Sequence, residues 1–423
     1  MKLQRAKGTR DFNPEEKIMR NKVVDVLREV FELFGFPPLE TPLIERTDVL
    51  AAKYAGGAEI LKEMFQLTDQ GGRKLALRYD LTVPFSRYVG MNPTVKMPFK
   101  RYQIGRVFRD GPIKLGRYRE FWQCDVDVMG CNKMTAEVEL LNLGVMAFKK
   151  IGLKVIISVN NRKVLDGILD AFGISDDKKV EIILTIDKIK KIPRKDLIAE
   201  LKQKGVKDVN KLLKIFEVEG TNKEKIDFLL KFVKTETGKQ GLEEVAQVFK
   251  IVKSKDVVFN PALARGLAYY TGMVYEAFMK NSDFKSSLAG GGRYDKMIGD
   301  FLGTKKIFPA VGLSFGLEPI TEMLKLKNQE IAKTVTEIFV VPINTLNECM
   351  KIVSDLRKQG VKTEIDIMGR GISKNLDYAN YYKIPYVLIV GDDEVKKNKV
   401  QLKNMVTGEQ KLISLAEVVK VLR

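Results

Sequence analysis

Residues 99–127 read FKRYQIGRVFRDGPIKLGRYREFWQCDVD, in which two runs rich in arginine and aromatic residues flank a connection that contains glycine and proline. This composition predicts an antiparallel β-hairpin whose loop is too long for a tight turn. Along the second run Gln123, Asp125 and Asp127 share one parity, while Cys124 and its apolar neighbours share the other. Because side chains alternate across a strand, we expect an amide and two carboxylates on one face of the sheet and apolar groups on the other.

Arginines stand at both ends of the loop in this hairpin. Arg109 ends the first run, and Arg117 and Arg119 open the second. Arginine carries a planar fork of donors that suits phosphate and carboxylate groups. The stretch therefore indicates an anionic, phosphorylated ligand lying on a sheet with a second polar ligand group beside it. An ordinary amphipathic hairpin with a solvated face has the same pattern and stays open as an alternative.

Length and composition restrict the class of protein. A chain of 423 residues has room for two or three domains. No apolar run reaches the roughly 18 residues of a membrane span, and the N-terminal sequence lacks the apolar core of a secretory signal. The three cysteines are an odd number without zinc-binding spacing. We therefore expect a reduced, cytoplasmic protein.

The net charge and the absence of histidine restrict the chemistry that the chain can perform. The formal net charge is +19, which favours a polyanionic partner such as nucleic acid, although a lysine-rich proteome produces the same excess. The chain contains no histidine, which excludes histidine-based triads, histidine metal ligands and imidazole proton shuttles. Catalysis must therefore use arginine, lysine, carboxylates, amides, hydroxyls or a group of the substrate.

A second set of motifs points to a family. Residues 262–276 read ALARGLAYYTGMVYE, and residues 288–295 read LAGGGRYD. Together with the hairpin they resemble histidyl-tRNA synthetase, a class II aminoacyl-tRNA synthetase, and most closely its archaeal and eukaryotic branch. The resemblance covers essentially the whole chain, because it continues in GTRDF (8–12), TPLIE (41–45), LRYDLTVPFSRY (77–88) and VNNRKVLDGIL (159–169).

This resemblance implies an α+β catalytic domain with the antiparallel sheet of class II synthetases, followed by a small α/β anticodon-binding domain. We place the catalytic domain at residues 1–325 and the C-terminal domain at residues 334–423, with the polar segment 325–333 as linker. The stretch 176–248 is rich in lysine and amphipathic, which predicts a helical insertion. In the family, such an insertion approaches the acceptor arm of the tRNA.

The C-terminal domain shows strand patterns that alternate with helix patterns. We expect strands at 338–343, 363–367 and 386–390, and helices at 346–357, 375–382 and 414–422. Such alternation predicts a compact α/β domain with a largely parallel sheet.

The resemblance also implies partners and an oligomeric state. The expected partners are histidine, histidine tRNA and ATP, with Mg²⁺ accompanying ATP as a substrate complex, and no protein-bound zinc or membrane is expected. Residues 15–34 have the apolar spacing of an amphipathic helix. The family places this helix and the strand bearing Pro42 at the interface of a homodimer.

Formation of an aminoacyl adenylate needs fixed cations, because negative charge builds up on the phosphoryl oxygens. By their positions in the family motifs, Arg109 and Arg265 are the predicted catalytic arginines, which bind the α-phosphate from two sides. Arg117 is expected near the β- or γ-phosphate. Glu120 is expected to face ATP, which requires a bulge or strand end because strict alternation puts it opposite the polar row. Arg293 is a further candidate ATP ligand.

Recognition of histidine requires donors and acceptors around the ring nitrogens and the ammonium group. A site built to hydrogen-bond a polar side chain rejects apolar isosteres, because its own groups would be left unpaired. The two adjacent tyrosines also fit simple core packing. The positions that match the family's histidine-binding residues are Asp80, Leu81, Thr82, Gln123, Asp127, Tyr269 and Tyr270.

Two positions depart from the family pattern. Ala268 stands where an acidic residue is usual, and Pro319, in GLSFGLEPI, stands where class II enzymes usually place an arginine that clamps the adenine and γ-phosphate. Arg117 or Arg293 are candidates to replace that arginine. Three alternatives stay open: an inactive regulatory paralogue from a histidine-biosynthesis complex, a synthetase-like tRNA sensor, and another class II synthetase.

Overall fold

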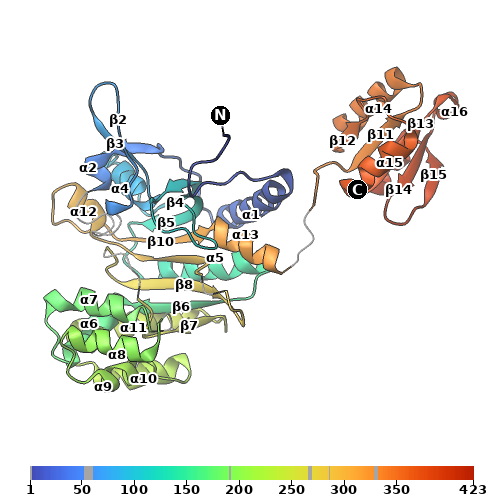
Figure 1. Cartoon of the computed structure of the whole chain (residues 1–423). Coiled ribbons are helices and arrows are strands. Elements are labelled where there is room, and N and C mark those ends of the chain that lie inside the picture. Colours follow the sequence, from blue (N-terminus) through green and yellow to red (C-terminus); the bar gives the residue numbers. More distant parts are fainter. Residues whose placement is uncertain (1, 52–60, 190–191, 265–268, 285, 328–331) are drawn as a thin grey trace. The chain divides into compact units, whose positions relative to one another are not determined.

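The computed structural model describes residues 2–51, 61–189, 192–264, 269–284, 286–327 and 332–423 (Figure 1). The chain forms two units, of which one comprises Met1–Arg10 with Val23–Asn328 and the other comprises Asp11–Lys22 with Gln329–Arg423. Among the described residues there is no helix with the length and apolar character needed to span a bilayer.

Residues 14–326 contain a mixture of helices and strands. The helices are α1 (Pro14–Leu33), α2 (Thr47–Leu50), α4 (Thr82–Met91), α5 (Thr135–Ile151), α6 (Arg162–Ala171), α7 (Asp176–Ile186), α8 (Arg194–Gln203), α9 (Val209–Phe216), α10 (Asn222–Phe232), α11 (Glu236–Ile251), α12 (Met297–Phe301) and α13 (Leu317–Leu326). The strands are β1 (Ile44–Arg46), β2 (Gln66–Thr68), β3 (Lys74–Leu77), β4 (Phe99–Phe108), β5 (Glu120–Met129), β6 (Val155–Asn161), β7 (Val257–Phe259), β8 (Met273–Met279), β9 (Ala289–Arg293) and β10 (Ala310–Gly316).

A seven-stranded sheet in the order β4-β5-β10-β9-β8-β6-β7 is the centre of this part of the chain. Its neighbouring strands are antiparallel except for β6 and β7, which are parallel. The β4–β5 ladder runs without interruption from Phe99 opposite Met129 to Phe108 opposite Glu120. The predicted hairpin is therefore confirmed, and its loop comprises residues 109–119.

One face of this sheet is apolar and covered by helices. The ring of Phe315 on β10 lies 5.8 Å from the ring of Phe31 on α1 and 5.4 Å from that of Phe148 on α5. Phe31 also lies 5.6 Å from Tyr102 on β4. Tilted aromatic contacts of this kind bury large apolar areas. The opposite face is therefore the one left for polar side chains.

Two smaller assemblies accompany the large sheet. Strands β1, β3 and β2 form an antiparallel three-stranded sheet. The stretch predicted as a helical insertion contains α7 to α11, which gather beside β6 and β7 in Figure 1. Helix α10 begins with a capping box, in which the backbone N–H of Thr221 donates to Glu224 over 2.7 Å. Such caps satisfy the free N–H groups at a helix start.

The C-terminal part forms a separate α/β sheet. Its elements are β11 (Ile338–Pro342), α14 (Leu346–Lys358), β12 (Thr363–Ile365), α15 (Ile372–Tyr381), β13 (Tyr386–Val390), α16 (Asp392–Lys396), β14 (Val400–Asn404), β15 (Gln410–Ile413) and α17 (Leu415–Leu422). The strand order is β12-β11-β13-β14-β15. The first three strands are parallel, but β14 and β15 are antiparallel to their neighbours.

The expectation of a largely parallel sheet is therefore wrong for its second half. The connections before β14 and before β15 span residues 391–399 and 405–409. A parallel neighbour needs a crossover of about a dozen residues or more, which these connections do not provide. The sheet is mixed because the last two strands return through short connections.

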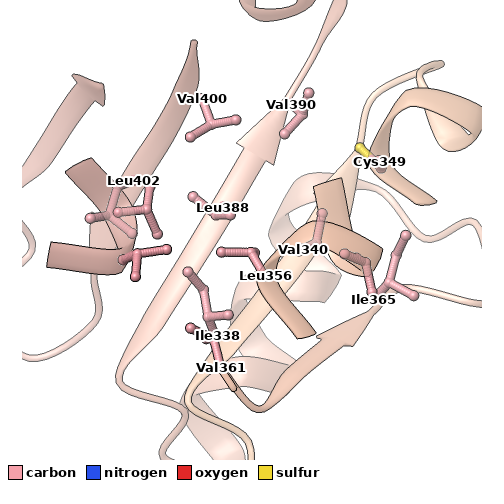
Figure 2. Packing of buried hydrophobic residues seen from close by; sticks show 13 residues of the cluster. Ile338, Val340, Cys349, Leu356, Val361, Ile365, Leu388, Val390, Val400 and Leu402 are labelled. Atoms are coloured by element: carbon pink, nitrogen blue, oxygen red, sulfur yellow. The ribbon is translucent and has the colours of Figure 1, made fainter. Parts of the chain in front are cut away.

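The core of this domain is apolar throughout its main cluster. Figure 2 shows the side chains of β11, β13, β14 and α14 that meet there, among them Ile338, Leu388, Leu402 and Leu356. Leu388 is fully buried on the central strand. This cluster gives the domain its own hydrophobic core, which is the usual mark of an independent folding unit.

Candidate active site

A pocket of about 500 Å³ lies over the polar face of the seven-stranded sheet. It is built by strands β5, β8, β9 and β10 together with the loop 109–119 and the start of α4. Its polar and charged lining includes Asp80, Thr82, Arg109, Arg117, Tyr118, Gln123, Asp125, Asp127, Tyr269, Tyr270, Glu276 and Ser314.

The strand register explains why polar groups collect on this face. Gln123, Asp125 and Asp127 on β5 all line the pocket, as alternation predicts. Asp125 lies opposite Gln103 on β4 and opposite Ser314 on β10, and directly opposed residues of an antiparallel pair point to the same face. The floor is therefore a continuous polar row across three strands.

Asp127 lies at the deep end of this row and is held by two partners. Its Oδ2 lies 2.7 Å from the guanidinium of Arg101, and its Oδ1 accepts a hydrogen bond of 2.5 Å from the hydroxyl of Tyr294. Arg101 is completely buried, donates to the carbonyl of Leu81 over 3.2 Å and lies over the ring of Phe85. Burial raises the pKa of Asp127, while Arg101 and Tyr294 oppose that rise.

Glycine at position 312 makes room for this carboxylate. Gly312 on β10 lies opposite Asp127 in the ladder, and a Cβ at that position would collide with Oδ1 of Asp127. A residue without a side chain is therefore required where the carboxylate approaches the neighbouring strand.

Three buried oxygen acceptors of the lining have neither a hydrogen bond nor an ion pair with the described residues. They belong to Asp80 (Oδ2), Gln123 (Oε1) and Asp125 (Oδ1). The other ends of two of these groups are fixed, because Oδ1 of Asp80 accepts from the backbone N–H of Val83 over 3.0 Å and Nε2 of Gln123 donates to Ser314 over 3.0 Å. An unpaired buried acceptor costs about 1–3 kcal/mol, so this arrangement is prepared for a ligand with several N–H donors.

Burial also changes the protonation of the two aspartates. It raises the pKa of Asp125 to about 7, with Arg101 opposing the rise and the charge of Asp127 adding to it. It raises the pKa of Asp80 to about 6, against the hydrogen bond from Val83 and the charge of Arg109. Carboxyl groups with raised pKa values in a pocket are typical of functional sites.

The cationic part of the pocket lies at the loop end of the hairpin. Arg109 follows β4 directly; its Nε donates to the carbonyl of Tyr79 over 2.9 Å, and its guanidinium lies over the ring of Phe121. No carboxylate in the described part of the chain pairs with it. Arg117, in the loop, pairs with Glu63 at 3.3 Å and is half exposed. The carboxylates of the pocket floor and the arginines that line the pocket, Arg109 and Arg117, thus lie at different ends of the hairpin.

A model of a protein family described as "Histidyl-tRNA synthetase" matches residues 8–320. The chain belongs to the histidyl-tRNA synthetase family. A second family model, described as "Anticodon binding domain", matches residues 337–423. The α+β architecture with a C-terminal anticodon-binding domain is therefore that of a class II histidyl-tRNA synthetase.

Individual relatives are similar to this chain in sequence over almost its full length. "Histidine--tRNA ligase 2" of Shouchella clausii is 43% identical and aligns with 96% of this chain and 97% of its own. "Histidine--tRNA ligase 1" of Bacillus cereus strain ZK / E33L is 41% identical, with 98% and 99% covered. Both are bacterial, so the expected likeness to the archaeal and eukaryotic branch is not supported.

Solved structures show the same fold. The crystal structure of histidyl-tRNA synthetase from Nostoc sp. PCC 7120 superposes with a TM-score of 0.89 at 28% identity, covering 100% of this chain and 99% of the other. An ATP phosphoribosyltransferase regulatory subunit/histidyl-tRNA synthetase from Bacillus halodurans C has a TM-score of 0.76 at 20% identity, with 92% and 98% covered. The second likeness concerns the fold alone.

The pocket brings together most of the residues predicted from the synthetase motifs. Tyr269 and Tyr270 line it with ring centroids 4.7 Å apart, and the ring of Tyr269 also lies 6.2 Å from that of Tyr294. The predicted residues that line it are Asp80, Thr82, Arg109, Arg117, Gln123, Asp127, Tyr269 and Tyr270. Their individual roles in binding stay predictions.

Four predicted site residues, Leu81, Glu120, Arg265 and Arg293, are not among the described residues that line the pocket. Leu81 is buried and reaches the site only through its carbonyl, which accepts from Arg101. Glu120 is the first residue of β5, in a ladder without a bulge, and its carboxylate pairs with Arg106 at 3.3 Å. Arg265 lies outside the described residues.

Arg293 does not line the pocket. Its guanidinium is buried in a two-pronged contact with Glu137 at 2.6 and 2.8 Å and also contacts Asp295. This geometry favours a structural ion pair over an ATP ligand. Arg293 is therefore a poor replacement for the third-motif arginine that Pro319 lacks.

Sequence reasoning missed Arg101, Asp125 and Tyr294 as site residues. Asp125 had the right parity but was not selected, Arg101 lies on the first strand of the predicted hairpin, whose exact register the sequence does not give, and Tyr294 is distant from β5 in the chain. The signal that could have found Arg101 is its position on β4, directly opposite Asp127 in the hairpin. A buried carboxylate row requires a buried cation nearby.

Proposed function

We propose that this chain is a histidine–tRNA ligase. In the first step, an oxygen of the histidine carboxylate attacks the α-phosphorus of ATP, the bond to the β-phosphate oxygen breaks, and pyrophosphate leaves. In the second step, a terminal ribose hydroxyl of histidine tRNA attacks the carbonyl carbon of histidyl-adenylate, and AMP leaves. Enzymes of this class use ATP with Mg²⁺ as a substrate complex.

The observation that carries this proposal is the set of unpaired buried acceptors in the pocket floor. Histidine offers an ammonium group and two ring nitrogens, so it supplies N–H donors for Asp80, Gln123 and Asp125. The carboxylate of Asp127, fixed by Arg101 and Tyr294, adds an acceptor at the deep end. A ligand of this polarity completes the hydrogen bonding of the site, whereas an apolar amino acid leaves it unpaired.

The cationic end of the pocket fits the nucleotide. Arg109 has guanidinium donors without a protein partner in the described part of the chain, so these donors are available to the α-phosphate. Arg117 is expected at the β- or γ-phosphate, and Arg265, from the family motif, is expected on the other side of the α-phosphate. Cations fixed before the reaction stabilise the charge that develops on the phosphoryl oxygens.

The remaining expectations concern the whole chain. The net charge of +19 supports binding of tRNA, with the C-terminal domain, residues 334–423, at the anticodon. The catalytic domain is proposed at residues 1–325, with the helical insertion at 176–248 toward the acceptor arm. We also propose a homodimer that uses α1 and acts in the cytoplasm.

The leading alternative is a regulatory paralogue without catalysis. Pro319 favours it, because the third-motif arginine is absent. Retention of Arg109, Gln123 and Asp127 in one pocket and the match to an anticodon-binding domain oppose it. The two functions differ in a single measurable step, the formation of histidyl-adenylate.

Pyrophosphate exchange with each amino acid in turn tests the proposal. We expect exchange with histidine only, in the presence of ATP and Mg²⁺. Arg109→Ala should lower the exchange rate by roughly 10²–10³ with little change in the requirement for histidine, because the lost donor acts on transition-state charge. Arg73→Ala is the matched control, since Arg73 is exposed and pairs with Asp69 far from the pocket lining.

Three outcomes distinguish the possibilities. No exchange with any amino acid, although ATP and histidine bind, contradicts the ligase and favours the paralogue. Normal turnover of Arg109→Ala with a raised histidine requirement makes Arg109 a ground-state contact. Histidine-dependent pyrophosphate exchange without aminoacylation of histidine tRNA would mean that the chain forms the adenylate but does not transfer histidine to tRNA.

A further inference from the structure

The N-terminal segment lies against the loop of the β4–β5 hairpin. The backbone N–H of Arg119 donates to the carbonyl of Gly8 over 2.9 Å, and the N–H of Arg109 donates to the carbonyl of Arg119 over 2.8 Å. Gly8 has a φ of +86°, and a Cβ there would lie 2.6 Å from the Cγ and Cδ of Arg119. Gly8 thus packs directly on Arg119, at the end of the loop that follows Arg109.

Arg10 ties this loop to the helix that follows the third motif. Its NH1 donates over 2.7 Å to the hydroxyl of Tyr118 and over 2.8 Å to Oε1 of Glu322 on α13. The guanidinium carbon also lies 4.8 Å from the centre of the Tyr118 ring. The side chains of Arg10 and Glu322 are only 21% and 13% exposed, so solvent weakens this pair less than an ordinary surface ion pair.

Tyr118 is the member of this contact that belongs to the pocket. It lines the pocket next to Arg117. Both residues lie in the loop that connects Phe108, the last ladder residue of β4, to Glu120, the first ladder residue of β5. Of the proposed acceptors for histidine, Gln123 and Asp125 lie on β5 and are held by the ladder, and Asp80 is held by its hydrogen bond from Val83. The loop lies outside the ladder, so its geometry depends on contacts from elsewhere.

Helix α13 carries Lys325, which pairs at 3.5 Å with Glu322, the same carboxylate that Arg10 contacts. Pro319 occupies the third-motif position, and a Cβ added at Gly116 would lie 3.5 Å from the Cα of Pro319, which is ordinary van der Waals contact. The first turn of α13 therefore lies close to Gly116 of the loop. A polar connection between loop and helix runs through Arg10, which donates to both Tyr118 and Glu322.

We propose that Arg10 is a positioning residue for ATP, which holds Tyr118 and the loop 109–119 against α13 through Glu322. The inference rests on the proposed ligase function of the pocket. A loop that is held in place before ATP binds loses less conformational freedom on binding. Arg10 thereby favours the nucleotide and has little influence on histidine, whose acceptors on β5 and at Asp80 lie outside the loop 109–119.

Steady-state pyrophosphate exchange with Arg10→Ala, Arg10→Lys and Glu322→Gln tests this role. Arg10→Ala should raise the KM for ATP by roughly tenfold, the loss expected for hydrogen bonds from a charged donor, with the KM for histidine within twofold of the parent. Arg10→Lys should recover part of the loss because it keeps the charge. Arg357→Ala is the control for loss of a partly buried arginine, since Arg357 donates to the carbonyl of Thr363 in the C-terminal domain.

Hydrogen exchange of the loop amides gives a second readout that does not require activity. In Arg10→Ala the amides of residues 110–119 should exchange faster than in the parent chain, while those of β4 and β5 stay protected. Equal increases in the KM for both substrates, or a lowered Tm with unchanged loop exchange, would make Arg10 a structural anchor only and overturn the proposal. If the parent chain activates no amino acid, the ligase function fails, whereas unchanged loop exchange refutes the role of Arg10.

Discussion

The floor of the active-site pocket and the core of the C-terminal domain are both buried, yet they are built from opposite kinds of residue. The C-terminal cluster around Leu388 consists of apolar side chains and one thiol (Figure 2). The pocket floor contains the buried carboxyl groups of Asp125 and Asp127, with the buried Arg101 beside them, and several of these polar atoms lack a hydrogen-bond partner.

The difference shows where stability and function are located in this chain. Burial of apolar surface stabilises a fold by about 25 cal/mol per Å², whereas a buried charge loses hydration that its partners replace only in part. The pocket floor therefore costs stability, and the strands that carry it must be supported by the aromatic face behind them. Mutations in the C-terminal core should therefore lower stability with little effect on activity, whereas mutations in the pocket floor should lower activity.

Truncation of the C-terminal core should have the largest effect on stability. Leu388→Ala removes a fully buried side chain from the central strand β13 and should destabilise the C-terminal domain by about 2–5 kcal/mol. The amides of β11 and β13 are expected to exchange faster, which hydrogen-exchange mass spectrometry measures. Histidine-dependent pyrophosphate exchange should change less than twofold, because the pocket residues all belong to the other unit.

Leu346→Ala is the matched control for this substitution. Leu346 is 55% exposed at the start of α14, so its loss should change stability by less than about 0.5 kcal/mol. Equal effects of the two variants would mean that the cluster in Figure 2 is not the stabilising core of the domain.

The comparison also explains what could be predicted from sequence. In the C-terminal domain, strands β11 and β13 and helix α14 were found because each carries a long apolar pattern of its own. Strand β14 and especially β15 were missed, since β15 is exposed along most of its length and its register is set by pairing with β14. Helix α16 is five residues long and rich in charge, which leaves no apolar period to detect.

Substitution of Asp125 should give the next largest effect, and the effect depends on pH. Burial raises the folded-state pKa of Asp125 to about 7, above the ordinary value of 3.8. Between these values the folded state keeps the proton while the unfolded state has released it, so the stability of the parent chain falls as pH rises from about 4 to about 7. The loss is on the order of a few kcal/mol and stays constant at higher pH.

Asp125→Asn removes this titration. Its Tm relative to the parent chain should therefore increase from pH 5 to pH 8, while histidine-dependent exchange falls because an acceptor for the substrate is altered. Asp69→Asn, at an exposed carboxylate paired with Arg73, is the control without a raised pKa. Parallel Tm curves for Asp125→Asn and the parent chain would show that Arg101 keeps Asp125 ionised against the effect of burial.

The site was harder to predict than the C-terminal domain for the same physical reason. Gln123 and Asp127 were found from strand alternation and family motifs, but a charged residue in a strand also fits a solvated face. Only the pairing of β5 with β4 and β10 shows that Arg101 and Gly312 enclose the carboxylate of Asp127. Sequence patterns record the local period of a strand, whereas this enclosure depends on the register of the hairpin and on β10, which is distant in the chain.

The smallest effect should come from the hydroxyl that fixes the deepest carboxylate. Tyr294→Phe removes the 2.5 Å hydrogen bond to Oδ1 of Asp127 but keeps the buried ring. Loss of a hydrogen bond to a charged group typically costs about 1.5 kcal/mol or more, so the KM for histidine should rise by roughly tenfold. The KM for ATP should stay within twofold, because Arg109 and the loop are at the other end of the hairpin. Tyr88→Phe is the control for the loss of a tyrosine hydroxyl elsewhere, since the ring of Tyr88 stacks on that of Phe99 at 6.3 Å. A comparable rise in the KM for ATP in Tyr294→Phe would contradict the separation of the two substrate sites along β5.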